Sequence, residues 1–461
     1  MNPAYDIAVV GAGPAGLAAA VTAAQAGCRV ALLDSAPHIG GQFWRHRDDD
    51  DGGGHRDWDV FARLRAGVLD STVDYRATAA VWFVESTADG FRLAGSAGET
   101  TAKLLVLATG AYDRVLPFPG WDLPGVVTLG AAQALLKGSG VPVGRRVVVA
   151  GAGPFLLPVA TSLLTAGAEV LGVYEAGNPR RYASWPRTLA GVRGKLREAA
   201  GYAAVLARHR VPYRTGYVVT AAYGTASVEA VDVTRLSPDG SLLPDTARML
   251  ECDALAVGFG FTPQLELPLA LDCATRLDVD GNLVLTADLA GQTTVPGVYA
   301  AGEVTGVGGA TLALVEGRLV GAVTAAACGR PSPLTEMELT KLLTRRTAMR
   351  RFAALMHEVH APPAGWTGWL TEETVVCRCE EVPVSRIRAA VEDLGATEAG
   401  TVRSLCRPGT GWCQGRVCGY ATAALTAQLC GRPLSAADLA AFATRPIASP
   451  VRLGDLATEE P

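Results

Sequence analysis

Half of the ten cysteines lie in one short stretch toward the C-terminal end of the chain. Four of them form two closely spaced pairs, Cys377-Arg-Cys379 and Cys413-Gln-Gly-Arg-Val-Cys418. Two pairs of thiolates suit a [2Fe–2S] cluster, whereas structural zinc usually prefers C-x2-C pairs. Disulfides are disfavoured because no export signal is evident, an apolar strand being expected from Tyr5. We therefore expect these four cysteines to hold a [2Fe–2S] cluster.

Glycines and arginines near the cysteine pairs fit such a site. Gly409 and Gly411 would allow backbone N–H groups to approach the sulfurs. A four-thiolate cluster becomes more negative on reduction, so neighbouring positive charge would raise its potential. The arginines expected to supply that charge are Arg378, Arg407 and Arg416. Cys406 fits neither pair and is interpreted as a bystander, and the other cysteines are interpreted as buried small hydrophobes: Cys28, Cys252, Cys273, Cys328 and Cys430.

A glycine-rich turn follows the first expected strand, which starts at Tyr5. The turn is Gly11-Ala-Gly13-Pro14-Ala15-Gly16; a helix is expected from Leu17 to Ala26, and a second strand ends in Asp34. In such a unit the first glycine permits the tight turn, the second admits a pyrophosphate and the third lets the helix pack on the strand. The helix N-terminus suits phosphates and the acid suits ribose hydroxyls. This order predicts dinucleotide binding; the alternative is a turn without a ligand.

Three further motifs place glycine beside polar side chains. Gly40-Gly41-Gln42 would let the backbone pass close to a nucleotide, and a buried strand leads into the Thr109-Gly110 turn. A strand from Thr294 delivers Gly302-Glu303, and the following helix would point its N-terminus beyond that acid. No CxxC or CxxxxC motif follows Gln42 in this part of the chain, so the dithiol of disulfide reductases is missing there.

A second strand–turn–helix unit opens at Arg145. Its strand runs into Gly151-Ala-Gly153-Pro-Phe-Leu156, an apolar helix follows, and a further strand ends at Glu175. Leu156 stands where the third glycine belongs, so helix and strand cannot approach as closely. Glu175 occupies the position of a ribose-binding acid and would disfavour a 2′-phosphate. Gly151, Gly153 and Glu175 therefore form either a nicotinamide- or adenine-nucleotide site or part of a retained Rossmann fold whose site is altered or empty.

Composition and charge narrow the class of protein. The 461 residues exceed what one compact core can hold, so two or three domains are expected. A hydrophobic content of 49% with 19% charged residues suits a well-buried α/β protein. The net charge of −4 gives no support for nucleic-acid binding. Glycines and polar residues interrupt the apolar stretch from Ile7 to Leu33, so it is not expected to span a membrane.

The expected fold class is α/β, with two Rossmann-like dinucleotide-binding domains and a small C-terminal helical [2Fe–2S] domain. On the helix expected between these parts, His357 and His360 lie close in sequence. Because no third ligand is evident, we favour a plain helix surface over a metal site there. The expected boundaries are 1–115 with 255–330 for the first domain, 116–254 for the second, 331–370 for a helical connector, 371–432 for the cluster domain and 433–461 for a tail.

With these motifs in view, residues 5–330 resemble the two-dinucleotide-domain flavoproteins of the glutathione-reductase type. The marks are GAGPAG at 11–16, the Ala108-Thr109-Gly110 turn and the strand that ends in Glu303; this last motif normally ends in Gly-Asp, one methylene shorter. Residues 371 to about 430 resemble the bacterioferritin-associated-ferredoxin-like [2Fe–2S] module. Together with Gly40-Gly41-Gln42, the Pro154–Pro158 run and the RPGTGWCQGRVCG ending, the chain resembles the α (A) subunits of the opine oxidase, hydrogen cyanide synthase and dye-linked proline or hydroxyproline dehydrogenase group.

The resemblance implies a division of labour between subunits. In that group a separate β subunit with the D-amino-acid-oxidase-like fold oxidises the amine, and the α subunit carries the electrons away. We accordingly expect a β subunit as partner, with or without a small third subunit. The expected electron acceptor is a quinone or a carrier protein. The resemblance also implies FMN where the two subunits meet and ATP or NAD at the second Rossmann site. The complex is expected in the cytoplasm, or peripherally at the inner face of the membrane.

The residues themselves support part of this division. A flavin accepts a hydride and releases single electrons, and a [2Fe–2S] cluster carries one, so a chain that holds both can split an electron pair. No catalytic triad, paired carboxylates or dithiol stands out. The competing hypotheses are an electron-transfer subunit, a stand-alone NAD(P)H reductase, against which Leu156 speaks, and a redox sensor. FAD is expected on Gly11, Gly13, Pro14, Ala15, Gly16, Asp34, Gly41, Gln42, Thr109, Gly110, Gly302 and Glu303.

Overall fold

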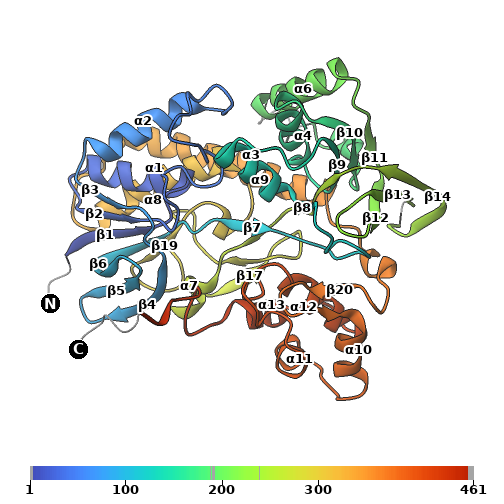
Figure 1. Ribbon diagram of the computed structural model, residues 1–461. Coiled ribbons are helices and arrows are strands. Elements are labelled where there is room, and N and C mark those ends of the chain that lie inside the picture. Colours follow the sequence, from blue (N-terminus) through green and yellow to red (C-terminus); the bar gives the residue numbers. More distant parts are fainter. Residues whose placement is uncertain (1–3, 187, 189–192, 238, 455–461) are drawn as a thin grey trace.

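The computed structural model describes residues 4–186, 188, 193–237 and 239–454. Figure 1 shows two α/β units side by side, with the C-terminal helices, orange to red, beneath the region where the units meet. This α/β architecture confirms the fold class expected for the two Rossmann-like units.

The first unit is built on a sheet of seven strands within the described residues, in the order β3-β2-β1-β6-β5-β4, with β19 also paired to β6. Five strands run parallel, and β4 and β5 extend the sheet in antiparallel fashion from the first half of β6. Strands β1, β2 and β19 and the end of β6 are apolar and buried, whereas the edge strand β3 is half-buried. The strands are β1 (Tyr5–Val10), β2 (Val30–Leu33), β3 (Val73–Arg76), β4 (Val81–Thr87), β5 (Gly90–Gly95), β6 (Gly98–Leu107) and β19 (Val298–Ala300).

Different elements pack against the two faces of this sheet. Ile7 and Val9 share a hydrophobic cluster with α1 (Pro14–Gln25), α2 (Trp58–Leu69) and α8 (Ala310–Ala327). Ala8 and Val10 point to the other face, as the alternation along a strand requires. That face packs against residues of α7 (Glu266–Ala270), β18 (Leu283–Leu285) and α13 (Ala436–Ala443), while β17 (Thr275–Leu277) pairs with β18.

Helix α8 lies directly against α1 because two glycines remove side chains from the contact. A Cβ at Gly317 would lie 2.1 Å from the Ala15 carbonyl oxygen, and one at Gly321 would lie 2.5 Å from that of Ala19. Among the described helices, α8 is the one long and apolar enough to cross a membrane, but 61% of it is buried inside the molecule. Its composition is therefore that of a core helix.

The second unit contains a five-stranded parallel sheet in the order β11-β10-β9-β15-β8, counted over the described residues. Three antiparallel strands, β12 to β14, pack beside it. The elements are β8 (Val126–Thr128), α3 (Leu129–Ser139), β9 (Arg146–Gly151), α4 (Leu156–Thr165), β10 (Glu169–Glu175), η1 (Pro179–Ser184), α6 (Arg193–Arg208), β11 (Tyr213–Thr215), β12 (Tyr217–Tyr223), β13 (Ala230–Leu236), β14 (Leu242–Glu251) and β15 (Ala254–Gly258).

A two-stranded link joins the units, because the chain leaves the first unit along β7 (Ala111–Asp113) and returns along β16 (Phe261–Pro263). After η2 (Glu303–Thr305) and α8, the long helix α9 (Glu336–Val359) begins with a capping box between Thr335 and Glu338. The C-terminal part then contains η3 (Trp366–Trp369), β20 (Val375–Cys377), β21 (Val382–Pro383), α10 (Val384–Glu392), α11 (Ala399–Cys406), α12 (Gly419–Leu429) and α13.

Candidate functional site

The four expected flavin motifs meet at one edge of the first sheet. Val10 is in register with Leu33 and Leu107, and Leu107 is in register with Ala300. Because these parallel strands end together, the segments that follow them emerge side by side. In open α/β sheets ligands bind at such carboxyl ends, where the strand order reverses. The fold thus brings together the Gly11 turn, Asp34, the Thr109-Gly110 turn and Gly302-Glu303.

The glycines at this edge stand where the backbone leaves no room for a side chain. Gly11 has φ +104°, and a Cβ there would lie 2.3 Å from the Ala108 carbonyl oxygen. A Cβ at Gly16 would lie 1.7 Å from the Gly11 oxygen, so α1 could not pack so close to the strand with a larger residue. A Cβ at Gly41 would lie 2.7 Å from the Gly13 Cα. The Gly41 loop therefore lies against the glycine turn and forms a second wall at the start of α1.

Asp34 is turned toward the glycine turn. Its carboxylate accepts hydrogen bonds from the Ala12 N–H at 2.5 Å and the Ala36 N–H at 2.7 Å. Burial raises the pKa of Asp34, although these two N–H groups oppose that shift. The exposed Gln42 side chain lies at the rim of the same region and accepts a hydrogen bond from Arg45. The acid is thus fixed at the turn that it was expected to accompany.

The Thr109-Gly110 turn is locked to the strand that returns from the second unit. The Thr109 hydroxyl donates to the Gln264 carbonyl at 2.9 Å, and the Gln264 N–H donates to the Gly110 carbonyl at 3.0 Å. Gly110 has φ +81°, a conformation that favours glycine. The turn is therefore held in place by the segment that follows β16.

Glu303 bends toward the start of α8. Its two carboxylate oxygens accept hydrogen bonds from the Gly308 and Gly309 N–H groups, each at 2.9 Å. Burial raises the pKa of this carboxyl group. The Glu303 carboxylate thus caps the loop that precedes α8.

Sequence reasoning missed Glu316, which lies behind this loop in the middle of α8. Its side chain is buried and accepts hydrogen bonds from the Gly302 N–H, the Arg346 Nε and two nitrogens of Arg350. Arg350 also donates to the Gly306 carbonyl. These contacts tie the connector helix α9 to the Gly302-Glu303 segment. The single carboxylate of a mostly apolar helix was the available signal.

In the second unit Glu175 is fully buried. Its carboxylate accepts hydrogen bonds from the Gly153 N–H at 3.2 Å and from the Gly177 N–H at 2.8 Å. One carboxylate oxygen lies 3.2 Å from Nδ1 of His360, at the end of α9. Leu156 is also fully buried and belongs to the apolar core of this unit. The expected ribose acid therefore already has partners from its own chain.

The end of helix α9 covers the β10 end of the second sheet. A Cβ at Gly177 would lie 2.7 Å from the Val359 carbonyl oxygen, and Tyr182 stacks on Phe352 with an interplanar angle of 14°. His357, one turn before His360, faces Asp280 at 3.6 Å and the Val307 carbonyl at 2.8 Å. The plain-helix-surface interpretation of the two histidines is therefore wrong, because each packs into the interior against a different carboxylate.

The four paired cysteines converge. The Cys418 thiol lies beside those of Cys377 and Cys413, and Cys413 in turn lies beside Cys379. Interaction with the Cys418 thiol lowers the pKa of Cys377 to about 6 and that of Cys413 to about 5, and the same interactions raise the pKa of Cys418. Cys377 and Cys418 are buried and Cys379 is exposed. The group therefore lies just beneath the surface.

The backbone around the cysteines fits a sulfur-ligated cluster. The Gly409 N–H donates to the Cys377 sulfur at 3.5 Å, and a Cβ at Gly411 would lie 2.3 Å from the Cys379 Cβ. Within the described residues, no set of three or more His, Cys, Asp or Glu side chains is placed to bind one metal ion. A [2Fe–2S] cluster does not require three protein ligands around one metal ion, because its four thiolates are divided between two irons. We call residues 409–419 the cysteine loop.

The three arginines expected near the cysteines have separate partners. Arg416, within the cysteine loop, forms an ion pair with Glu266 at 2.8 Å and lies over the Tyr112 ring. Arg378 lies 4.1 Å from the centre of the Trp121 ring. Arg407 is exposed and pairs with Glu380 at 2.9 Å. Of the three, Arg416 connects the loop to the first unit, through α7 and the strand β7 that follows the Thr109-Gly110 turn.

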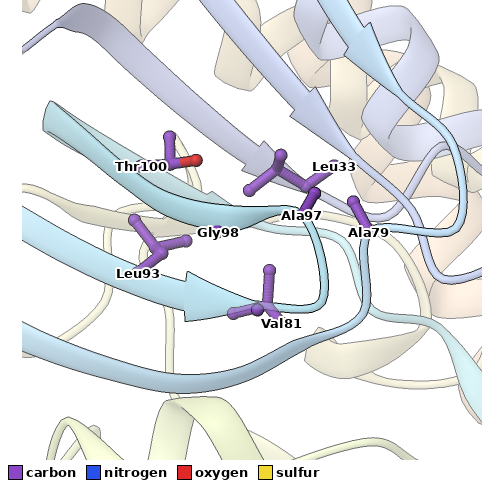
Figure 2. Close-up of a pocket in the computed structure, with 8 residues that line it drawn as sticks. Leu33, Ala79, Val81, Leu93, Ala97, Gly98 and Thr100 are labelled. Carbon is purple, nitrogen blue, oxygen red and sulfur yellow. The ribbon is translucent and has the colours of Figure 1, made fainter. Parts of the chain in front are cut away.

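Two of the cavities in the described part of the chain border the first unit. The one in Figure 2 measures about 10 Å³, lies among Leu33, Leu93 and Thr100, and is barely large enough for one water. The other measures about 50 Å³ and lies between the β7–β16 link and the cysteine loop, with Tyr112, Glu266 and Arg416 in its wall. The larger cavity thus lies where the cysteine loop meets the first unit.

Comparison with known proteins agrees with this architecture. Residues 5–329 match the family "Pyridine nucleotide-disulphide oxidoreductase". The chain is 34% identical to the A subunit of opine oxidase from Agrobacterium tumefaciens (strain Ach5), covering 98% of this chain and 91% of that protein. It is 31% identical to the HcnB subunit of hydrogen cyanide synthase from Pseudomonas protegens, covering 89% and 90%. The crystal structure of L-proline dehydrogenase from P. horikoshii shares the fold, with a TM-score of 0.70, 21% identity and coverage of 98% and 79%.

Two Rossmann-like units joined by a two-stranded link, with glycine turns at the carboxyl ends of their strands, define a flavin-dependent oxidoreductase of the two-dinucleotide-domain class. The chain belongs to the pyridine nucleotide-disulphide oxidoreductase family. The resemblance to the opine oxidase and hydrogen cyanide synthase group is confirmed by these relatives. Because they are named as subunits, the chain is related to parts of heteromeric oxidoreductases.

Proposed function

We propose that this chain is the electron-transfer subunit of a heteromeric amine or imino-acid dehydrogenase or oxidase. It would hold FAD at the Gly11 turn and a [2Fe–2S] cluster on Cys377, Cys379, Cys413 and Cys418. When bound, the flavin accepts electron pairs and releases single electrons, and the cluster carries one at a time. The observation that carries the proposal is the approach of the two cysteine pairs: the Gly409 N–H donates to Cys377, and Gly411 packs against Cys379. The ion pair of Arg416 and Glu266 ties the cysteine loop to the proposed flavin-binding unit.

Different residues of the chain would bind different parts of the proposed cofactors. Gly13 and Gly41 would admit the pyrophosphate, and Asp34 lies at the turn where a ribose binds. The buried network of Glu316 and Arg350 holds the Gly302-Glu303 segment at the same edge. Cys379 is exposed and Trp412, next to Cys413, is 83% exposed, which would leave the proposed cluster site open to a redox partner.

The structure of the second unit supports the hypothesis of a stand-alone NAD(P)H reductase less well than that of an electron-transfer subunit. Its ribose acid, Glu175, is fully buried and faces His360 instead of an open cleft. We propose that this unit takes a regulatory or structural nucleotide, ATP or NAD, only when the end of α9 moves away. The proposed complex is completed by the substrate-oxidising β subunit, an FMN at its interface and a quinone or carrier protein as acceptor, in the cytoplasm or at the inner face of the membrane.

An anaerobic reductive titration tests the proposal. The purified chain, reconstituted with FAD and iron, is titrated with NADH, then NADPH, then dithionite, while flavin and iron–sulfur absorbance are followed. We expect dithionite to reduce both centres and the nicotinamides to reduce neither. Rapid bleaching by NADH would show a reductase in its own right, and absence of iron–sulfur absorbance after reconstitution would remove the cluster from the proposal.

A further inference from the structure

The C-terminal segment, residues 435–448, lies against the cysteine loop. Its helix α13 begins with a capping box in which Ser435 and Asp438 exchange hydrogen bonds. Arg432 donates two hydrogen bonds, of 2.6 and 2.7 Å, to the Asp438 carboxylate and holds its pKa well below the usual range. The start of the segment is therefore firmly anchored beside α12.

Phe442 fills the space beneath the cysteine loop. Its ring is buried and belongs to the same hydrophobic cluster as one face of the first sheet. A Cβ on any of three loop glycines would lie within 3.0 Å of Phe442, and these glycines are Gly409, Gly415 and Gly419. The loop is thus shaped to this ring, because no larger residue fits at those three positions without a shift of the ring or the loop.

Arg445 holds the turn that follows Cys413. Its guanidinium donates to the Gln414 carbonyl, to the Gln414 side chain and, at 3.2 Å, to the Gly409 carbonyl. Gln414 has φ +55°, a left-handed conformation that is unfavourable for a residue with a side chain. A strained residue next to a ligand persists only when its surroundings hold it, and Arg445 supplies that support from a distant part of the sequence.

The far end of the segment connects the same loop to the first unit. The Ala448 carbonyl accepts a hydrogen bond from Arg416 at 2.7 Å, and the Ala448 N–H donates to the Trp82 carbonyl at 2.7 Å. Trp82 belongs to strand β4. The segment therefore contacts the cysteine loop on one side and the first sheet on the other.

We infer that the C-terminal segment is an integral wall of the cysteine site and that Arg445 is a positioning residue for it. Arg445 fixes the left-handed turn at Gln414, and Phe442 supports the loop glycines, so that Cys413 and Cys418 are held toward the other pair. The inference rests on the proposed function, in that the four cysteines hold a [2Fe–2S] cluster. Residues that orient ligands in this way typically change metal affinity by about ten- to a hundredfold when replaced.

The test measures how fast iron leaves the reconstituted full-length chain in the presence of a ferrous chelator. The loss of the cluster is monitored by visible circular dichroism. We expect Arg445→Gln to release iron about tenfold faster than the wild type and Arg445→Lys to fall between them. The matched control is Arg452→Gln, which replaces an exposed arginine of the same C-terminal region and should leave the rate unchanged. An unchanged FAD content shows that each variant folds.

The possible outcomes distinguish failure of the inference about Arg445 from failure of the proposed function. If the loaded wild type and Arg445→Gln release iron at the same rate, the inference is wrong and the proposed function stands. If the wild type takes up no iron–sulfur cluster on reconstitution, the proposed function and the inference fail together. Should Arg445→Gln not fold, Phe442→Leu keeps an apolar side chain beneath the loop but not the ring, and a release rate equal to the wild type would overturn the inference equally.

Discussion

Arg416 and Glu266 form an ion pair of 2.8 Å between the cysteine loop and the start of α7. Glu266 is buried and Arg416 is mostly buried, so removing one partner leaves the other charge without compensation. Breaking a buried pair in this way costs about 3–5 kcal/mol. We predict that Arg416→Met lowers the thermal midpoint strongly. The double variant Arg416→Met/Glu266→Leu should recover much of that loss.

The control for this prediction lies nearby. Arg407 is exposed and pairs with Glu380 at 2.9 Å, so Arg407→Met should cost less than about 1 kcal/mol. Thermal unfolding of the wild type and these three variants, followed by circular dichroism, gives the comparison. Equal losses of thermal stability in Arg407→Met and Arg416→Met would contradict the prediction that the buried ion pair contributes more to stability than the exposed one.

The contact between Glu175 and His360 leads to a prediction about nucleotide binding. A ligand that needs the end of α9 to move binds with an apparent affinity equal to its intrinsic affinity multiplied by the fraction of molecules in which α9 has moved away. His360→Ala weakens the closed state, so ATP or NADH should bind several-fold more tightly to this variant than to the wild type. Isothermal titration calorimetry with each nucleotide measures the difference.

His357→Ala provides the matched control, because His357 faces Asp280 and the Val307 carbonyl instead of Glu175. Its nucleotide affinity should equal that of the wild type. Equal affinity of the wild type and His360→Ala would mean that this contact does not compete with a nucleotide.

The sequence predicts a feature well when its cause is local. The turn at Gly11 and the close packing at Gly16 depend on backbone geometry within a few residues, and both are present. The roles of Glu316 and His360 depend on where α9 runs, which is a matter of tertiary packing between segments far apart in the sequence. The hydrogen bonds of the Glu303 carboxylate with two N–H groups before α8 likewise depend on the path of the following loop, which the motif does not specify.

The close approach of Gly41 and Gly13 predicts a sharp dependence of FAD content on one residue. Gly41 has φ +61°, and its Cβ would collide with the Gly13 Cα at 2.7 Å, so Gly41→Ala must push the loop away from the glycine turn. We expect that variant to purify with much less FAD. Gly27 has a similar φ of +85°, but none of the described atoms near its Cβ position lies within 4 Å.

Gly27→Ala therefore carries the backbone strain of about 1 kcal/mol without the collision. The ratio of flavin absorbance to protein in the two purified variants separates the effects. Comparable loss of FAD in both would assign the effect to general destabilisation, and full FAD in Gly41→Ala would contradict the proposed pyrophosphate site.

Lys137 gives a prediction about pH. Its ammonium donates to the Phe43 carbonyl at 3.1 Å, in the loop that follows Gly41. Burial lowers the pKa of Lys137 from its ordinary value of 10.5 to about 8, although Asp50 opposes this shift. Between about pH 8 and 10.5 the folded chain therefore binds fewer protons than the unfolded chain, so this lysine makes stability rise with pH across that window. Below about pH 8 the penalty for burying the charge is fully present.

Lys137→Met removes this pH dependence, because the variant has no proton to lose at that position. Thermal midpoints measured from pH 7.5 to 10.5 should shift in favour of the wild type relative to this variant as the pH rises. The exposed Lys341 provides the control, because the difference between Lys341→Met and the wild type should stay constant. A constant difference for Lys137→Met as well would show that this ammonium is not held in a poorly solvated position.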